Sequence, residues 1–155
     1  EMIRVAAVGK LSEIFKPAAG EYLKRLNGFI KAEVIEVAEG KETGGNPGDT
    51  AKNIASESLA LINASKGKII ALDSRGGEMT SEGLALFLES VMMSGSPDIT
   101  FIIGGSNGLS QEVLKKAEKT ISFGRFTYPH QLMRVILLEQ LYRAYTIINN
   151  IKYHK

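Results

Sequence analysis

One segment near the carboxyl end, residues 131–148, constrains the fold more than any other, because we expect a helix there that is apolar on two sides. At about 100° per residue, the residues that share its core-facing stripe are Met133, Leu137, Leu141, Ala144 and Ile148. The opposite side carries both apolar and polar residues. The apolar ones are Leu132, Val135, Ile136, Tyr142 and Ile147, and they lie among the polar residues Gln131, Arg134, Glu139, Gln140 and Arg143. A second surface must cover that side, and we expect a second copy of the chain to supply it.

Polar segments flank this helix at both ends. A glycine-containing turn precedes it over residues 123–130, and Tyr153-His154-Lys155 follow it as a tail that we expect to be loose, since chain termini usually are. The turn offers many backbone donors and lies beside the expected subunit interface. We therefore predict a ligand site that two copies share.

Strand and helix patterns alternate along the chain. Strands are predicted over residues 2–8, 32–37, 68–72, 99–103 and 120–123. Helices are predicted over residues 17–25 and 50–63, from a cap at Thr80 or Ser81 to 93, from a cap at Ser110 to 116, and over 131–148. A glycine-rich loop is expected at 38–49 and a turn at 73–77. Because the central strands are almost wholly apolar, we predict an α/β fold with a mostly parallel sheet and helices on both faces, in one domain of residues 1–155.

Composition narrows the possible functions. The chain has no cysteine, which excludes disulfides, thiolate metal sites and a cysteine nucleophile. It shows neither a secretory signal pattern nor an apolar run long enough to cross a membrane, so we expect a cytoplasmic protein. Residues 1–110 carry 11 basic and 14 acidic side chains, whereas residues 111–155 carry 8 and 3. This polarity indicates a phosphate-bearing partner near the carboxyl-terminal third, although a solvated basic face explains it equally well.

Three candidate ligand segments follow predicted strands: Leu72-Asp73, Gly104-Gly105 and residues 123–130. The carboxyl ends of parallel strands meet at one edge of a sheet, where ligands bind. Tight turns without a ligand are the alternative for each segment. The dinucleotide fingerprint, the P-loop and the nucleophile elbow are all absent from the sequence, and His130 and His154 do not have metal-ligand spacing.

Together, these segments resemble the SPOUT superfamily of methyltransferases, whose sheet is closed by a deep trefoil knot, and more narrowly the ribosomal RNA large subunit methyltransferase H family. The resemblance covers essentially the whole chain. It is carried by Val8-Gly9-Lys10, residues 21–25, Ala71-Leu72-Asp73, residues 102–110, 128–134 and 139–144, and Tyr153-His154-Lys155.

The resemblance implies a homodimer packed through the last helix that uses S-adenosylmethionine, and no metal, to methylate N3 of a pseudouridine. The implied target lies in the helix 69 loop of 23S rRNA on assembled ribosomes. The implied cofactor-binding residues are Leu72, Gly104, Phe123, Gly124, Arg125, Phe126, Thr127 and Tyr128. The family commonly has a Ser-Lys-Met-Thr-Phe-like run where this chain has residues 123–128, but backbone contacts would survive that change.

Three further residues match family positions near the substrate: Arg143, Tyr153 and His154. His154 is a candidate base for the N3 proton, because an unperturbed imidazole is largely neutral at pH 7. Arg143 is instead a candidate to stabilise the anion that develops on the ring.

Three other interpretations stay open at this point. The chain is an enzyme of the same superfamily that acts on a different RNA such as tRNA, a non-catalytic module that binds an adenosine ligand or RNA, or a structural dimer without a ligand.

Overall fold

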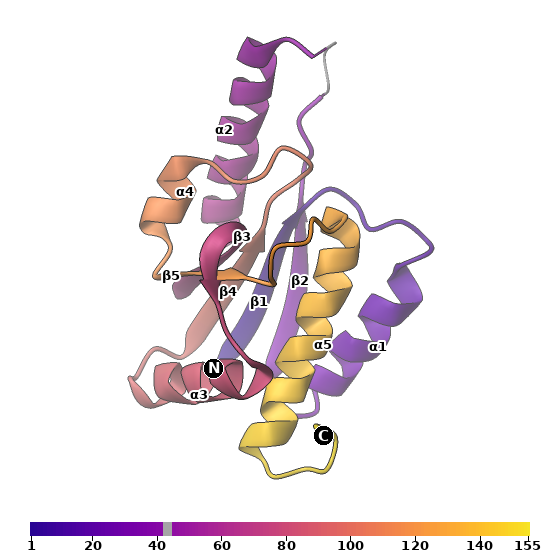
Figure 1. Ribbon diagram of the computed structural model, residues 1–155, viewed down its shortest axis with the longest axis vertical. Helices are drawn as coiled ribbons and strands as arrows, with labels where there is room; N and C mark the ends of the chain where they lie inside the picture. The colour runs from indigo at the N-terminus through magenta and orange to yellow at the C-terminus, as the bar shows by residue number, and fades with distance from the viewer. Residues whose placement is uncertain (42–44) are drawn as a thin grey trace.

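The computed structural model describes residues 1–41 and 45–155, which form a parallel β-sheet flanked by helices (Figure 1). The order of elements is β1 (Met2–Val8), α1 (Lys16–Leu26), β2 (Lys31–Val37), α2 (Pro47–Ala64), β3 (Lys68–Glu78), α3 (Ser81–Met93), β4 (Asp98–Ile103), α4 (Gln111–Lys116), β5 (Lys119–Ser122) and α5 (His130–Ile148). The strand order is β2-β1-β4-β3-β5, and every pairing between these strands is parallel. The predicted α/β class is therefore confirmed.

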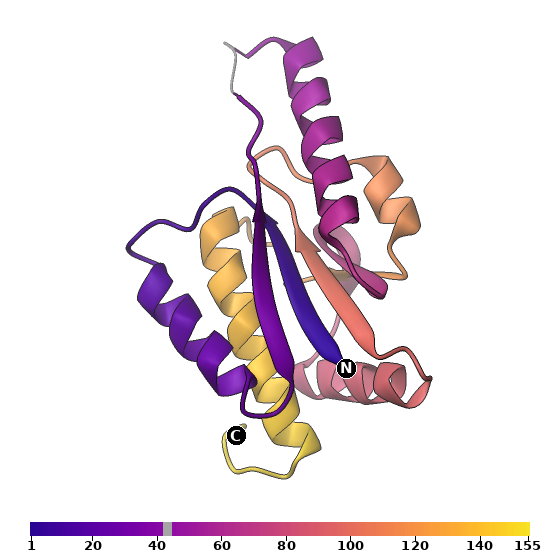
Figure 2. The same cartoon turned by 180° about the vertical axis from the view of Figure 1, so that it is seen from behind.

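Helices cover both faces of the sheet, as predicted (Figures 1 and 2). Ile3 and Val5 of β1 belong to one core cluster, which includes buried residues of α1, α3 and α5. Ala6 and Val8 belong to a second cluster, completed by residues of α2 and α4. Alternate residues of a strand point to opposite faces, so this one short strand contributes to both cores. Among the described residues, no helix is both long and apolar enough to span a bilayer.

The start of α2 and the end of β3 differ from the prediction. Helix α2 begins at Pro47 rather than residue 50, because the Asn46 side chain caps it by accepting from the Gly48 N–H at 3.0 Å. The loop predicted at 38–49 is shorter as a result, and its residues 42–44 lie outside the described part of the chain. Strand β3 does not end at Leu72 but continues to Glu78 after a shift in its register with β5.

Helix α5 has the predicted core stripe with one large exception. Leu137, Leu141 and Ala144 are buried, whereas Met133 and Ile148 at its two ends are half-buried. Arg134, placed above on the opposite side of the helix, is only 1% exposed. A second copy of the chain is not needed to cover it, because the same chain supplies three oxygen acceptors to the two Nη atoms of the guanidinium.

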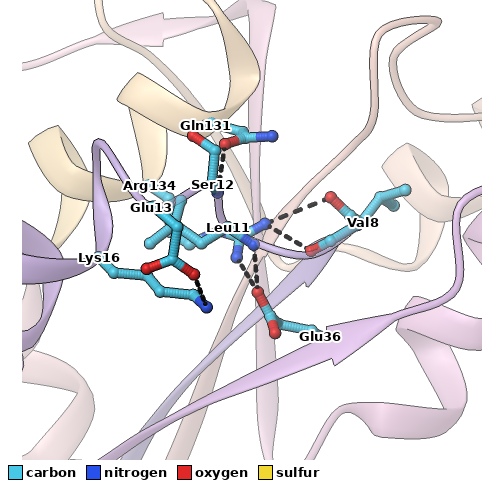
Figure 3. Close-up of polar contacts among 9 residues, drawn as sticks. Val8, Leu11, Ser12, Glu13, Lys16, Glu36, Gln131 and Arg134 are labelled. Atoms are coloured by element: carbon cyan, nitrogen blue, oxygen red, sulfur yellow. Dashed lines mark hydrogen bonds and ion pairs between the residues drawn. The ribbon is translucent and has the colours of Figure 1, made fainter.

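Those acceptors come from the ends of β1 and β2 (Figure 3). Arg134 Nη1 donates to Glu36 Oε2 at 2.6 Å, and Nη2 donates to the carbonyl oxygens of Val8 and Gly9 at 3.3 and 3.0 Å. The same Glu36 oxygen accepts from the Leu11 N–H at 2.7 Å. These bonds hold the first turn of α5 against the edge of the sheet where β1 and β2 end.

Part of the covering that the sequence assigned to a second copy comes from the same chain. Helix α1 lies alongside α5, and α3 runs across the other side of α5 (Figure 1), with buried residues of all three helices in one core cluster. The Tyr142 ring lies 6.5 Å from that of Tyr22 and 6.1 Å from that of Phe29. Val135 and Ile147 likewise pack against the larger core cluster.

Candidate functional site

Residues 72–75 of β3 and the loops that follow β4 and β5 line a cavity of about 680 Å³, which we call the edge cavity. All eight residues predicted to bind the cofactor line it, namely Leu72, Gly104, Phe123, Gly124, Arg125, Phe126, Thr127 and Tyr128. The volume lies within the range of roughly 300–1,000 Å³ that is typical of small-molecule sites. The structure thus brings together three segments that are far apart in sequence.

Strand register explains why these segments meet. Leu72 of β3 pairs with Ile103 of β4 on one side and with Ile121 of β5 on the other, so the three strands reach the same level. The chain then turns back sharply after β4, where Gly108 N–H donates to the Gly105 carbonyl at 3.0 Å. This tight loop leaves no room for a side chain at Gly104, since an added Cβ would lie 2.8 Å from the backbone of Gly108.

We expect Gly104→Ala to weaken S-adenosylmethionine binding by at least about tenfold, or ~1.4 kcal/mol, because the β4–α4 loop would have to move out of the edge cavity. Isothermal titration calorimetry measures this. The matched control is Gly20→Ala in α1, where an added Cβ meets nothing within 4 Å. Equal affinities in the two variants would show that the loop is not part of the cofactor site.

The β5–α5 loop contributes backbone groups and the large Phe126 ring to the lining of the edge cavity. Gly124 has φ +103°, a conformation that side-chain-bearing residues rarely adopt. The Ser122 hydroxyl fixes this turn by accepting from the Gly124 N–H at 3.2 Å and donating to its carbonyl at 3.1 Å. Phe126 is 82% exposed, so its ring stands at the rim of the edge cavity without burial.

Residues 73–77 were predicted as a turn, but they belong to β3, and they supply an ion pair that the sequence did not single out. Arg75 Nε and Nη2 donate to the two oxygens of Asp73 at 2.7 and 2.8 Å, and Nη2 also approaches the Leu109 carbonyl at 3.3 Å. The Arg75 hydrogen bonds hold the pKa of Asp73 below its usual value, against the opposing effect of burial. Both residues line the edge cavity, and Arg75 joins β3 to the loop that follows β4. An acidic residue two positions before a basic one was the available sequence signal.

A second cavity of about 360 Å³, the inner cavity, lies between the end of β3, the start of α3 and α5. It shares Leu72 and residues 121–124 with the edge cavity. Ser81 and Gln140 line the inner cavity and are bonded to each other, with Ser81 Oγ donating to Gln140 Oε1 at 2.7 Å.

The three predicted substrate-side residues form one cluster, the tail cluster of Arg143, Tyr153 and His154. The Arg143 guanidinium lies 4.8 Å from the centre of the Tyr153 ring, and its Nη1 lies 3.3 Å from His154 Nδ1. None of the three is among the residues that line the edge cavity. The structure therefore gathers these residues, but not at the predicted cofactor site of the same chain.

The tail is docked, so the expectation that it is loose was wrong. The Tyr153 ring packs edge-on to Tyr142, with ring centres 4.8 Å apart. His154 Nε2 lies 2.7 Å from Oε1 of Glu82, in the first turn of α3. Partners distant in sequence hold the tail, and local reasoning about chain ends does not detect them.

Protonation within the tail cluster follows from its bonds. The Glu139 hydrogen bond raises the pKa of Arg143, and burial followed by the Glu139 bond raises the pKa of Tyr153, so both stay protonated at neutral pH. A guanidinium only donates, so His154 Nδ1 accepts from Arg143 and Nε2 carries the hydrogen shared with Glu82. Among the described residues, no three His, Asp or Glu side chains are grouped as metal ligands.

Comparison with known proteins assigns the family. A family model described as a predicted SPOUT methyltransferase matches residues 2–154. The ribosomal RNA large subunit methyltransferase H of Carboxydothermus hydrogenoformans is 47% identical over 158 residues, and that of Limosilactobacillus reuteri is 45% identical over 157, each covering 99% of both chains. This chain therefore belongs to the SPOUT methyltransferases and, within them, to the ribosomal RNA large subunit methyltransferase H family.

Solved structures agree on the fold. A probable methylase family protein from Haemophilus influenzae superposes with a TM-score of 0.54 at 14% identity, over 99% of this chain and 70% of that one. The tRNA (m1G37) methyltransferase from Aquifex aeolicus gives 0.53 at 16% identity, over 92% and 70%. At such low identity, the likeness extends to the fold alone.

Proposed function

We propose that this protein uses S-adenosylmethionine to methylate N3 of a pseudouridine in the helix 69 loop of 23S rRNA, on assembled ribosomes. The observation that carries the proposal is the convergence of all eight predicted cofactor residues on one cavity. Two relatives that match the full length of the chain are named as ribosomal RNA methyltransferases, which supports the substrate class.

The edge cavity suits this cofactor in size and lining. Backbone groups of residues 104–109 and 123–128 would bind the polar edge of the adenine, and the side chains of Leu72 and Phe126 would pack on its faces. The bound cofactor supplies a methyl group that is already activated. The protein has to hold the acceptor nitrogen in line with it, so orientation contributes much of the rate.

A homodimer packed through α5 would complete the site. Helix α5 has 19 residues and separates the β5–α5 loop from the tail by about 28 Å, at 1.5 Å per residue. We infer that the tail cluster of a second copy approaches the edge cavity of the first. The half-buried residues Leu132 and Ile136 lie on α5, where such packing would cover them.

Within the tail cluster, His154 is the proposed base. Its Nδ1 is an acceptor in the neutral ring, and Arg143 Nη1 now occupies that lone pair. Pseudouridine N3–H would replace this donor and give up its proton to Nδ1 as the methyl group is transferred. Arg143, released from the His154 imidazole, would then stabilise the negative charge that develops on the pseudouridine ring.

Three further features belong to the same proposal: one domain over residues 1–155, a cytoplasmic location, and a trefoil knot. Support for the knot comes from the end of β3, which pairs with β5 again at Gly77↔Ile121 and Glu78↔Ser122 just before the chain enters the β5–α5 loop.

The deciding experiment uses ribosomes from a strain that lacks this protein. Purified protein and S-adenosylmethionine with a labelled methyl group are added, and mass mapping locates the label. A single label on a pseudouridine of helix 69 is expected. Label on tRNA instead would indicate the different-RNA interpretation, cofactor binding without transfer to any RNA would indicate the non-catalytic module, and absence of binding would indicate the structural dimer.

A further inference from the structure

Glu139 lies at the centre of the tail cluster, although no role was assigned to it above. Its Oε1 accepts from Arg143 Nε at 3.0 Å and from Arg143 Nη2 at 2.5 Å. The same oxygen accepts from the Tyr153 hydroxyl at 3.1 Å. Its side chain is 17% exposed, and it is the single acidic residue of α5. One carboxylate thus binds two of the three proposed substrate-side residues directly.

These bonds determine which edge of the Arg143 guanidinium faces His154. Because Nε and Nη2 are both bound to Glu139, the guanidinium turns its Nη1 edge toward His154. The plane of the guanidinium is fixed as well, since the Tyr153 ring lies 4.8 Å from it and is held by the same carboxylate. Removing the Glu139 charge would free all three side chains at once.

The other oxygen of Glu139 is bonded to Gln140, which lines the inner cavity. Oε2 accepts from Gln140 Nε2 at 2.9 Å, and Gln140 in turn accepts from Ser81 at 2.7 Å. The hydrogen-bonded path therefore continues from the tail through α5 to the first turn of α3. Both oxygens of this carboxylate are satisfied, as expected of a group that holds other side chains in place.

We propose that Glu139 is a positioning residue that holds Arg143, Tyr153 and, through Arg143, His154 in one fixed arrangement for methyl transfer. This inference rests on the proposed function of the tail cluster. Glu139 itself contacts neither the cofactor nor the acceptor, because its two oxygens are occupied by side chains of its own protomer.

The test compares Glu139→Gln with the control Glu89→Gln, an exposed residue of α3. We expect Glu139→Gln to lower kcat on ribosomes about 10- to 100-fold, while the Kd for S-adenosylmethionine changes less than twofold. Glu89→Gln should change neither. A purely structural role of Glu139 would instead lower the thermal midpoint or the cofactor affinity without this selective loss of kcat.

A second readout does not depend on RNA. The chain has two histidines, so the imidazole ¹⁵N signals of His154 are readily assigned by comparison with His154→Gln. We expect wild-type His154 to be the neutral form with hydrogen on Nε2, and Glu139→Gln to shift it toward the tautomer mixture of a free histidine. Unchanged His154 signals together with a kcat within twofold of wild type would overturn the proposal.

The variant Tyr153→Phe covers the case in which Glu139→Gln fails to fold, because it removes only the hydroxyl group that donates a hydrogen bond to Glu139. We expect a smaller loss of kcat, a shift of the His154 signals in the same direction, and no further loss when it is combined with Glu139→Gln. Independent, multiplying losses would contradict the shared arrangement. If wild-type protein transfers no methyl group to ribosomes, the proposed function fails, whereas the His154 signals still report on Glu139.

Discussion

Replacing His154 by alanine is expected to lower the single-turnover rate of methyl transfer by about 10²- to 10⁴-fold, the usual contribution of a positioned general base. The Kd for S-adenosylmethionine should change less than twofold, because the proposed partner of His154 is the N3 proton of the RNA and not the cofactor. Removing the imidazole leaves the N3 proton without its acceptor, whereas the cofactor loops are untouched. Rapid-quench methylation of ribosomes at saturating cofactor measures the rate, and calorimetry measures the affinity.

The control for His154→Ala is Lys152→Ala, an exposed residue of the same tail that is outside the tail cluster. It should retain the wild-type rate apart from a modest effect of the lost charge on RNA binding. A single-turnover rate for His154→Ala equal to that of wild type would exclude His154 as the base and leave Arg143 as the candidate for direct stabilisation of the acceptor anion.

The second large effect concerns stability. Arg134→Met keeps an unbranched apolar stem but removes the guanidinium, leaving the Val8 and Gly9 carbonyl oxygens and Glu36 without this donor. Breaking a buried pair costs about 3–5 kcal/mol. Glu36 is 39% exposed and can regain water, so we expect a loss near the lower end, about 3 kcal/mol, in the free energy of unfolding. Urea denaturation at pH 7 measures it.

Acid sensitivity provides a second signature of the same pair. Burial alone would raise the pKa of Glu36, but the Leu11 N–H and the Arg134 guanidinium outweigh it and hold the pKa below its ordinary value. A carboxyl whose pKa is lowered by folding stabilises the native state above its unfolded pKa of about 4.3 and loses that contribution as the pH falls through the folded pKa. As the pH falls below about 5, the free energy of unfolding should therefore decrease less in Arg134→Met than in wild type.

Lys66→Met is the matched control for Arg134→Met, because it removes an exposed cation that faces Asp98 at 3.6 Å. Surface pairs of this kind contribute about 0–1 kcal/mol, so a small change is expected. If the two variants unfolded at the same urea concentration, the bonds of Arg134 would not be an important source of stability.

Local signals in the sequence located most helix starts. The sequence predicts caps at Ser110 and at either Thr80 or Ser81, and the structure selects Thr80: the Thr80 and Ser110 hydroxyls accept from Gly83 N–H at 3.0 Å and Val113 N–H at 3.3 Å. A cap acts within three residues, so the chain carries the whole signal in one place. The cap at Asn46 was missed because Gly45, Pro47 and Gly48 around it indicate a loop equally well.

Contacts between distant residues were not recoverable in this way. The pattern of α5 places Arg134 opposite the core stripe, because periodicity detects which side a residue lies on but not a partner 98 residues away. The docking of Tyr153 and His154 depends likewise on Glu139 and Glu82, the latter 72 residues from its partner. The identities of the candidate site residues came from family resemblance. Their expected meeting at one edge came from the rule that parallel strands end together, and the edge cavity is consistent with it.

By itself, the sequence determined the alternation of strands and helices, the parallel sheet and the three segments that follow its strands, because apolar periodicity and capping are written in neighbouring residues. The tertiary structure alone decided that Arg134 is buried, that the tail is docked, and that Tyr153 lies against the Glu139–Arg143 pair of α5. Each of these depends on where charged groups from different elements come to lie, and electrostatic pairing through space leaves no period along the chain.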